Sequence, residues 1–183
     1  ATAEVRALFE RAAGQRVEII DFRRTTAESQ DMSSGVTRER RDEGRYVRFD
    51  LGSDSLLEPV STEDQRFRIT NYDPRELART HAPGRHQFLL AREIFEADVV
   101  IGMPKLKTHR KAGITGTLKN LVGINGSKEF LPHHRKGSPA QGGDCYPRPS
   151  MWLNATEEAL DRANTRIGTD GYTEWRDRAL KYW

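Results

Sequence analysis

The spacing of apolar residues along the chain predicts several amphipathic helices. Residues 2–14 carry apolar side chains three and four positions apart, and Gly14 is suited to end that helix. At 73–84 a short capped helix is expected to break at the Pro-Gly pair that closes the segment. The same period predicts helices over four further ranges: 87–97, 114–123, 150–168 and 172–183. Ser150 is the candidate N-cap of the helix at 150–168.

Strand patterns fall between these helices. Alternating apolar and charged residues predict half-buried strands at 45–52 and, more briefly, at 66–70, and the segment "RVEIIDF" at 16–22 also predicts a strand. The segment "DVVIGMP" at 98–104 is a near-continuous apolar run, which is typical of a buried parallel strand. No apolar period marks 23–44, so we predict a mobile loop or insertion there.

The order of these elements predicts an α/β fold, with a mixed or mainly parallel sheet and flanking helices. The chain of 183 residues has the length of a single domain, 1–183. It begins with Ala rather than Met, so we interpret it as a fragment of a longer domain whose sheet is incomplete and whose targeting signal can be missing. Without a long apolar run, and with Cys145 as its one cysteine, we expect a cytoplasmic protein with no membrane partner.

Lysine is concentrated in one part of the chain. Of the 30 basic residues only seven are Lys, and six of these lie between 105 and 136. The window 99–143 contains a single acid, Glu129. Lysine is a compact charge that serves in phosphate contact, carboxylate contact and proton transfer. A basic window of this kind indicates an anionic partner, and a solvated surface loop is the alternative interpretation.

The predicted strand at 98–104 would bring this basic segment to the end of a sheet, where open α/β sheets bind ligands. The helix predicted at 114–123 would begin there with free backbone N–H groups, which can hold a phosphate or a carboxylate. We therefore predict the following ligand-binding residues: Gly113, Thr115, Gly116, Lys119, Asn120 and Arg135.

The five histidines suggest further chemistry. His81 and His86 are expected to fix a turn. His109, the pair at 133–134 and Asp144 are zinc-type ligands, but no H-E-x-x-H or C-x-x-C spacing supports such a site, and we predict no metal. General acid–base chemistry by one histidine is the interpretation we prefer, with ordinary hydrogen bonding for the others. The predicted catalytic residues are Lys105, Lys107, His109, His133, His134 and Asp144.

Nucleic acid is not the expected partner. The basic window contains little aromatic interleaving beyond Phe130, and no DNA- or RNA-binding motif is present. Its positive charge lies among glycines, which favours a small anionic ligand.

The segment "ADVVIGMPKLKTHRKAGITGTLKNLVGINGSKEFLPHHRKGSPAQGGDCYP", 97–147, closely resembles the core signature of the domain-of-unknown-function 362 family. The likeness is carried by "PKLKTH", by "TGTLKNLVG" and by the loop that runs from "PHH" through "GSP" to "GGDCYP". Some members of this largely uncharacterised family carry a ferredoxin-like iron–sulfur module, which this sequence lacks, so the cofactor stays unknown. The resemblance implies that the family's shared site consists of Lys105, Lys107, His109, Lys119, Asn120, His133, His134 and Asp144.

Two function hypotheses follow. The leading one is an enzyme, or enzyme subunit, that binds a small phosphate- or carboxylate-bearing substrate at 105–144, and the alternative is a non-catalytic docking domain for an acidic protein or an iron–sulfur electron carrier. An enzyme needs these residues in one concave pocket, whereas a docking surface spreads them over an exposed face. In the enzyme, Lys105→Arg and Lys119→Arg should impair ligand binding, because the planar fork of Arg cannot replace a point donor. Lys136→Arg should be silent.

Overall fold

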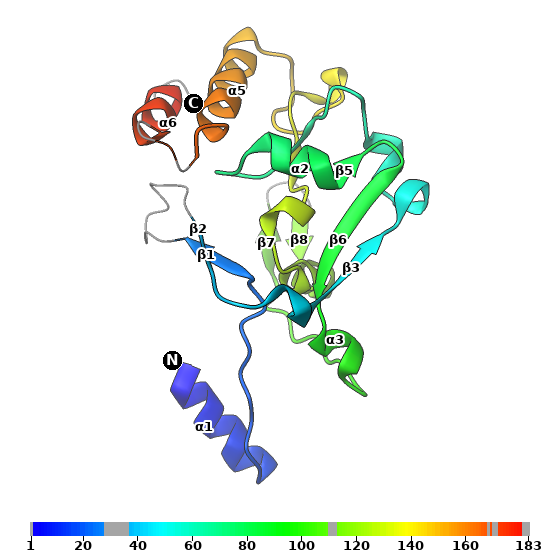
Figure 1. The fold of residues 1–183 in the computed structure, drawn as a ribbon, viewed down its shortest axis with the longest axis vertical. Helices are drawn as coiled ribbons and strands as arrows, with labels where there is room; N and C mark the ends of the chain where they lie inside the picture. The colour runs from blue at the N-terminus through cyan, green and yellow to red at the C-terminus, as the bar shows by residue number, and fades with distance from the viewer. Residues whose placement is uncertain (1, 28–36, 110–112, 168, 170–171, 181–183) are drawn as a thin grey trace.

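The computed structural model describes residues 2–27, 37–109, 113–167, 169 and 172–180, and Figure 1 shows their arrangement. The α-helices are α1 (Thr2–Ala13), α2 (Pro74–Thr80), α3 (Glu93–Glu96), α4 (Thr117–Leu121), α5 (Met151–Asn164) and α6 (Tyr172–Leu180). The strands are β1 (Thr25–Ala27), β2 (Thr37–Glu39), β3 (Tyr46–Asp50), β4 (Phe67–Arg68), β5 (His81–Ala82), β6 (Arg85–Ala91), β7 (Lys107–His109), β8 (Gly113–Thr115) and β9 (His134–Arg135).

Among the described residues, the largest sheet has three antiparallel strands in the order β3–β6–β5. β3 pairs with β6 from Tyr46 opposite Ala91 to Asp50 opposite Gln87. β5 turns directly into β6 through Gly84, whose φ of +72° lies in the left-handed region that favours glycine. This sheet forms the spine of the molecule in Figure 1.

The hydrophobic core lies against one face of this sheet. Tyr46, Leu89, Ala91 and Phe130 form it, and none of the four is more than 4% exposed. Leu89 and Ala91 are two positions apart on β6, so their side chains lie on the same face. Gly126 packs directly on the ring of Tyr46, since a Cβ at this position would lie 2.2 Å from a ring carbon. Glycine is therefore a packing requirement at 126.

A smaller sheet pairs β4 with β9, where Phe67 lies opposite Arg135 and Arg68 lies opposite His134. α5 and α6 pack against each other at the end of the molecule opposite α1 (Figure 1). Ser150 caps α5 by accepting a hydrogen bond from the Leu153 N–H at 3.3 Å. This end of the molecule contains the pocket described below.

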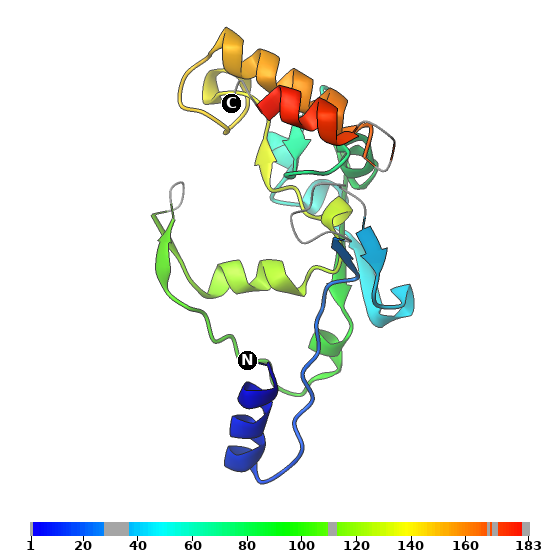
Figure 2. The same ribbon diagram turned by 90° about the vertical axis from the view of Figure 1, so that its left-hand side faces the viewer.

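The segment 98–124, called the arm here, leaves the body after α3 and returns just before Gly126. It consists of an irregular stretch, the β7–β8 hairpin and α4, and Figure 2 shows it as a long excursion to one side of the molecule. Its return is fixed by two backbone hydrogen bonds. The Gly126 N–H donates to the Leu89 carbonyl at 2.8 Å, and the Gly126 carbonyl accepts from the Arg24 N–H at 2.7 Å.

Most of the predicted helices and two of the predicted strands are confirmed. Gly14 has a φ of +66°, and its N–H donates to the Glu10 carbonyl at 3.0 Å, which ends α1 as expected. Helices occupy most of the ranges 2–14 and 150–168, the described part of 172–183, and the first turns of 73–84. Strands occupy most of 45–52 and part of 66–70.

Three element predictions need correction. The segment 16–22 forms no strand. The segment 87–97 begins in β6, because Leu89 and Ala91 contact the core with the period of a strand, and only its last part is the helix α3. The segment 114–123 is shared between β8, α4 and a short 3₁₀ turn. Short apolar runs fit both periods, so tertiary contacts decide between them.

The expectation of a mainly parallel sheet is also wrong, although the mixture of helices and strands is confirmed. Every strand pairing in the described residues is antiparallel. The segment 98–104 forms no strand, and Val99, Ile101 and Met103 are 74%, 77% and 73% exposed. A run this apolar forms a buried strand only when other strands flank it, and none of the described strands pairs with it.

The segment 23–44 contains the β1–β2 hairpin, in which Thr25 lies opposite Glu39. Its central residues, 28–36, lie outside the described part of the chain. The assignment of 23–44 as a mobile loop, and of 1–183 as one domain cut from a longer one, therefore stays a prediction.

Candidate functional site

The predicted site residues of the arm lie on an exposed element. Lys105, Lys107, Lys119 and Asn120 are all exposed. In the β7–β8 hairpin Lys107 pairs with Thr115, whose hydroxyl donates to the Lys107 carbonyl at 3.3 Å. Thr115 is thus occupied in holding the hairpin together, and the arm presents Lys105, Lys107 and Lys119 to solvent.

The predicted anion seat at the start of α4 has little support in the geometry. α4 is only five residues long, so its dipole is small. Gly116 precedes it, and Gly113 sits in the hairpin with a φ of +72° opposite His109. Gly116 forms the entry to α4, and a glycine at 113 is explained by its backbone conformation alone.

The other predicted residues form a second group beside β9. The Asp144 carboxylate accepts from the Arg135 N–H at 3.1 Å and lies 3.7 Å from its guanidinium, and the Cys145 thiol donates to the Arg135 carbonyl at 3.2 Å. The rings of His133 and His134 meet edge to face, with centroids 5.7 Å apart. His133 is exposed and His134 is half-buried. The loop therefore brings Arg135 and Asp144 together.

These two groups do not converge. β7, β8 and α4 lie on the arm, whereas β9 lies beside α5, and Figure 2 separates the two regions clearly. The residues that the sequence assigns to one site thus fall on two separate surfaces of the molecule.

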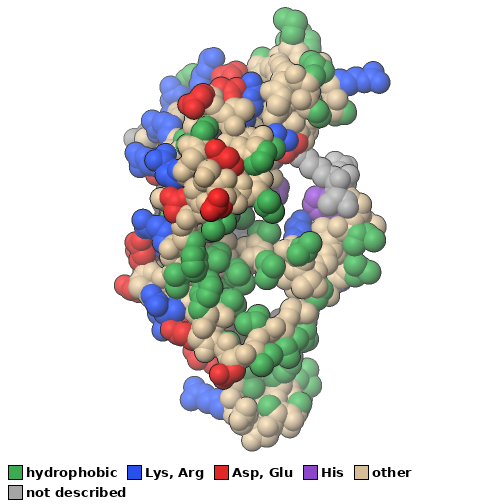
Figure 3. Space-filling model, turned by 90° about the vertical axis from the view of Figure 1, so that its right-hand side faces the viewer, with side chains coloured by type: hydrophobic (Ala, Val, Ile, Leu, Met, Phe, Trp, Pro, Cys, Tyr) green, Lys and Arg blue, Asp and Glu red, His purple; other side chains and the backbone are tan. Residues whose placement is uncertain are grey.

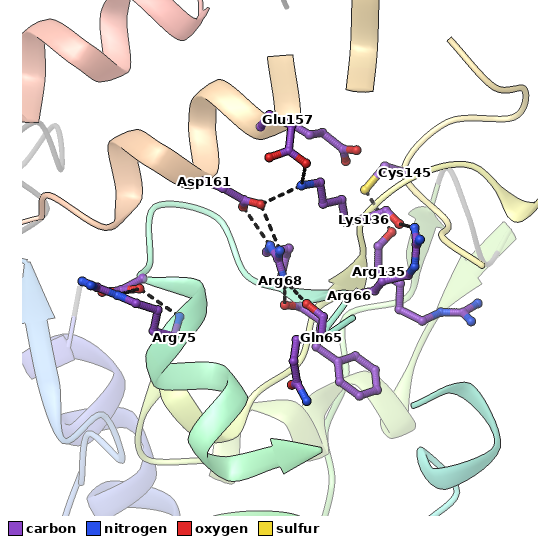
Figure 4. Close-up of polar contacts among 12 residues, drawn as sticks. Gln65, Arg66, Arg68, Arg75, Arg135, Lys136, Cys145, Glu157 and Asp161 are labelled. Atoms are coloured by element: carbon purple, nitrogen blue, oxygen red, sulfur yellow. Dashed lines mark hydrogen bonds and ion pairs between the residues drawn. The ribbon is translucent and has the colours of Figure 1, made fainter. Parts of the chain in front are cut away.

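A pocket of about 280 Å³ lies between the β4–β9 sheet and α5. Figure 4 shows the polar contacts of Arg68, Lys136 and Asp161, which line it. Its charged lining residues are Arg68, Lys136, Glu157 and Asp161, and its uncharged ones are Ile69, Thr70, Asn71, His134, Leu160 and Asn164. Of the predicted site residues, His134 is the one that the pocket includes.

An ion-pair network forms one wall of this pocket. Arg68 binds Asp161 with two hydrogen bonds, Nε to Oδ1 at 2.8 Å and Nη2 to Oδ2 at 2.9 Å. Lys136 Nζ donates to the same carboxylate at 2.9 Å and also pairs with Glu158. Burial raises the pKa of Asp161, but Arg68 and Lys136 outweigh it, so the net shift is downward. The carboxylate is therefore held in its charged form between two cations.

Glu157 ties the preceding loop to α5. Its carboxylate accepts from the Gly137 N–H at 3.0 Å and from the Tyr146 hydroxyl at 3.1 Å. Burial, followed by the adjacent Glu157 charge, raises the pKa of Tyr146 to about 12. Both ends of the 137–146 loop are thereby fixed to one carboxylate, which holds β9 and Lys136 in position.

Sequence patterns missed Arg68, Glu157 and Asp161, and they placed Lys136 outside the site. Arg68 and Asp161 are 93 residues apart and belong to no recognised spacing. The i,i+4 relation of Glu157 and Asp161 on the predicted helix 150–168 was the available signal, since it places two carboxylates on one helix face.

A buried histidine pair lies at the β5–β6 turn. His81 and His86 face each other across the strands, with their Nδ1 atoms 3.3 Å apart and both residues fully buried. His86 Nε2 lies 3.0 Å from a Glu58 carboxylate oxygen and 3.1 Å from the Ser61 hydroxyl. Each imidazole thus helps to fix the turn, as expected.

His81 should make stability depend on pH. Burial lowers the pKa of His81 to about 4, below its unfolded value of about 6.5. Between these two pH values the imidazole is protonated in the unfolded chain but not in the folded one. Its contribution to the free energy of unfolding is therefore fully present above about pH 6.5 and is lost on acidification. We expect a loss of about 2 kcal/mol between about pH 7.5 and about pH 5, measured by urea unfolding.

His81→Gln should remove this pH dependence, while His133→Gln, at an exposed histidine, should keep it. An unchanged slope in His81→Gln would contradict the assignment of the effect to His81.

The family described as a domain of unknown function (DUF362) matches residues 53–168, so the chain belongs to the domain-of-unknown-function 362 family. The matched range contains both the arm and the pocket, and it confirms the resemblance seen in the sequence. No curated protein and no solved structure matches the chain.

In the described residues, no three His, Cys, Asp or Glu side chains are grouped as metal ligands would be. Among the same residues, no helix has the length and apolar character needed to cross a bilayer.

Proposed function

We propose that the chain is a docking domain whose arm binds an acidic partner protein. The observation that carries this proposal is the exposure of Lys105, Lys107 and Lys119 on an element that stands out from the body. Converging lysines would favour a small-substrate enzyme, whereas exposed lysines spread along an excursion favour a surface that meets another macromolecule.

Charge complementarity identifies the partner as acidic. No Asp or Glu occurs between 99 and 128, so the arm beyond Asp98 carries only positive side-chain charge. Positive surfaces steer acidic partners into contact and discriminate against basic ones. The partner must therefore present a negatively charged surface long enough to follow the hairpin.

Exposed apolar side chains on the arm support a protein partner rather than a small anion. Figure 3 shows hydrophobic side chains gathered over much of one face of the molecule. Exposed apolar groups of this extent mark interaction surfaces. On the arm they are Val99, Val100, Ile101, Met103, Leu106, Ile114, Leu118, Leu121 and Val122, each at least 43% exposed.

The rival function is an enzyme that holds a small phosphate or carboxylate between the arm lysines and the histidines of β9. It would require the arm to close by a large movement, because the two groups lie apart (Figure 2). The docking function needs no such movement. The two functions also differ in how strictly they require lysine, which gives a direct test.

Charge reversal on the arm should abolish docking, whereas Lys→Arg should not. The probe is an acidic peptide rich in Glu and Leu, and its Kd is measured by fluorescence anisotropy at low and high salt. We expect the triple variant Lys105→Glu, Lys107→Glu, Lys119→Glu to raise the Kd at least tenfold, about 1.4 kcal/mol. The corresponding triple Lys→Arg variant should bind the peptide with the same Kd as the unaltered chain. High salt should weaken peptide binding by both of these proteins.

A matched charge control is Arg178→Glu, an exposed cation on α6 at the far end of the molecule, which should leave the Kd unchanged. Saturable binding of inorganic phosphate that is lost in the triple Lys→Arg variant would overturn docking and support the enzyme. Failure of the acidic peptide to bind would also overturn it.

A further inference from the structure

The pocket between the β4–β9 sheet and α5 has features of a ligand site that is independent of the arm. Its cationic side chains are already paired, because Arg68 and Lys136 both donate hydrogen bonds to the Asp161 carboxylate. The guanidinium of Arg68 is further occupied by the Phe67 carbonyl, which accepts from Nη1 at 2.7 Å. The wall of the pocket is therefore a closed ion-pair network with little net charge to offer a ligand.

The hydrogen-bonding capacity that remains is mostly neutral. Within the described residues, the side-chain amides of Asn71 and Asn164 take part in no hydrogen bond, although both line the pocket. Each amide offers two donors and one acceptor oxygen, and the Thr70 hydroxyl offers both functions as well. Hydroxyl and amide groups of a ligand need this mixture of donors and acceptors.

An anion fits this pocket poorly. To bind Arg68 or Lys136 it would have to displace the Asp161 carboxylate, and the resulting unpaired charge in a partly buried site is strongly unfavourable. An uncharged ligand leaves the network intact. Two apolar residues, Ile69 and Leu160, supply the non-polar surface against which a ligand ring can pack.

From this geometry we propose that the pocket binds a small uncharged molecule bearing several hydroxyl or amide groups. Its volume of about 280 Å³ is at the lower end of ligand pockets, which suits a molecule of about monosaccharide size. This site does not depend on docking by the arm, since the two lie on different elements.

The test uses the side-chain NH₂ signals of Asn71 and Asn164 in ¹H–¹⁵N NMR spectra of the full chain. D-Glucose and N-acetylglucosamine serve as neutral probes, with inorganic phosphate and acetate as anionic probes at equal ionic strength. We expect a neutral probe to shift both signals saturably and the anions to leave them unchanged. A saturable response to phosphate or acetate alone, or no saturable response to any probe, would overturn the proposal.

Asn164→Leu should weaken binding of the neutral probe at least tenfold, because it removes one amide and fills part of the pocket. Binding by this variant is followed through the side-chain signals of Asn71. Ala155→Leu is the matched control, since it introduces the same side chain at an exposed position of the same helix. Equal loss of binding in both variants would show that the effect is not local to the pocket. Thermal unfolding of each variant verifies that α5 remains folded.

Discussion

Gly143→Ala is expected to lower the free energy of unfolding by about 3 kcal/mol or more, at the upper end of overpacking effects. A Cβ at this buried position would lie 2.2 Å from the carbonyl oxygens of Lys136 and Gly137. These are backbone atoms, so no flexible side chain can move aside. The surrounding turn is also held by hydrogen bonds, since the Gly143 N–H donates to the Ser138 carbonyl at 2.8 Å and the Cys145 N–H to the Gly137 carbonyl at 2.9 Å.

The measurement is urea unfolding followed by circular dichroism, with Gly123→Ala as the control. A Cβ at Gly123 would meet no atom within 4 Å, so this variant should differ from the unaltered chain by less than about 0.5 kcal/mol. Equal midpoints for the two variants would contradict the close backbone approach at Gly143.

Asp161→Asn is expected to cost about 3 kcal/mol. Asparagine keeps the size of the side chain but removes the charge that compensates Arg68 and Lys136. Breaking a buried pair by removing one partner costs about 3–5 kcal/mol, and the lower value applies because Arg68 and Asp161 keep 15% and 19% of their side-chain surface exposed. The loss should appear as a lower urea midpoint at neutral pH.

The matched substitution is Glu158→Gln. It also removes a carboxylate that pairs with Lys136, but that side chain is 54% exposed, so a loss below about 1 kcal/mol is expected. If Glu158→Gln were as damaging as Asp161→Asn, the stabilising role would belong to Lys136 alone and not to the network around Asp161.

Features that depend on nearby residues could be predicted from the sequence. Ser150 caps α5 as proposed, and Gly14 ends α1, because caps and helical periods involve residues within a few positions of one another. The alternation around Tyr46 likewise indicated β3, since one face of that strand packs on the core.

Features that depend on distant partners could not be predicted. The apolar residues of 98–104 suit a buried strand, but strand formation needs neighbouring strands that the local pattern does not specify. In the same way, Lys119 and His133 are close in sequence and chemically suited to one site, yet the chain places them on the arm and beside β9. The contact of Arg68 with Asp161 arises only when β4 meets α5.

The β4–β9 pairing has a consequence for the order of folding. The two histidines that pair across the β5–β6 turn are five residues apart, whereas Arg66 and Lys136, joined beside the β4–β9 ladder, are 70 apart. Closing the longer loop costs more chain entropy, so we expect the turn to form before the β4–β9 contact. We therefore expect the pocket to open by local unfolding more readily than the β3–β6 core. Amide hydrogens around β9 would accordingly exchange with solvent before those of β6.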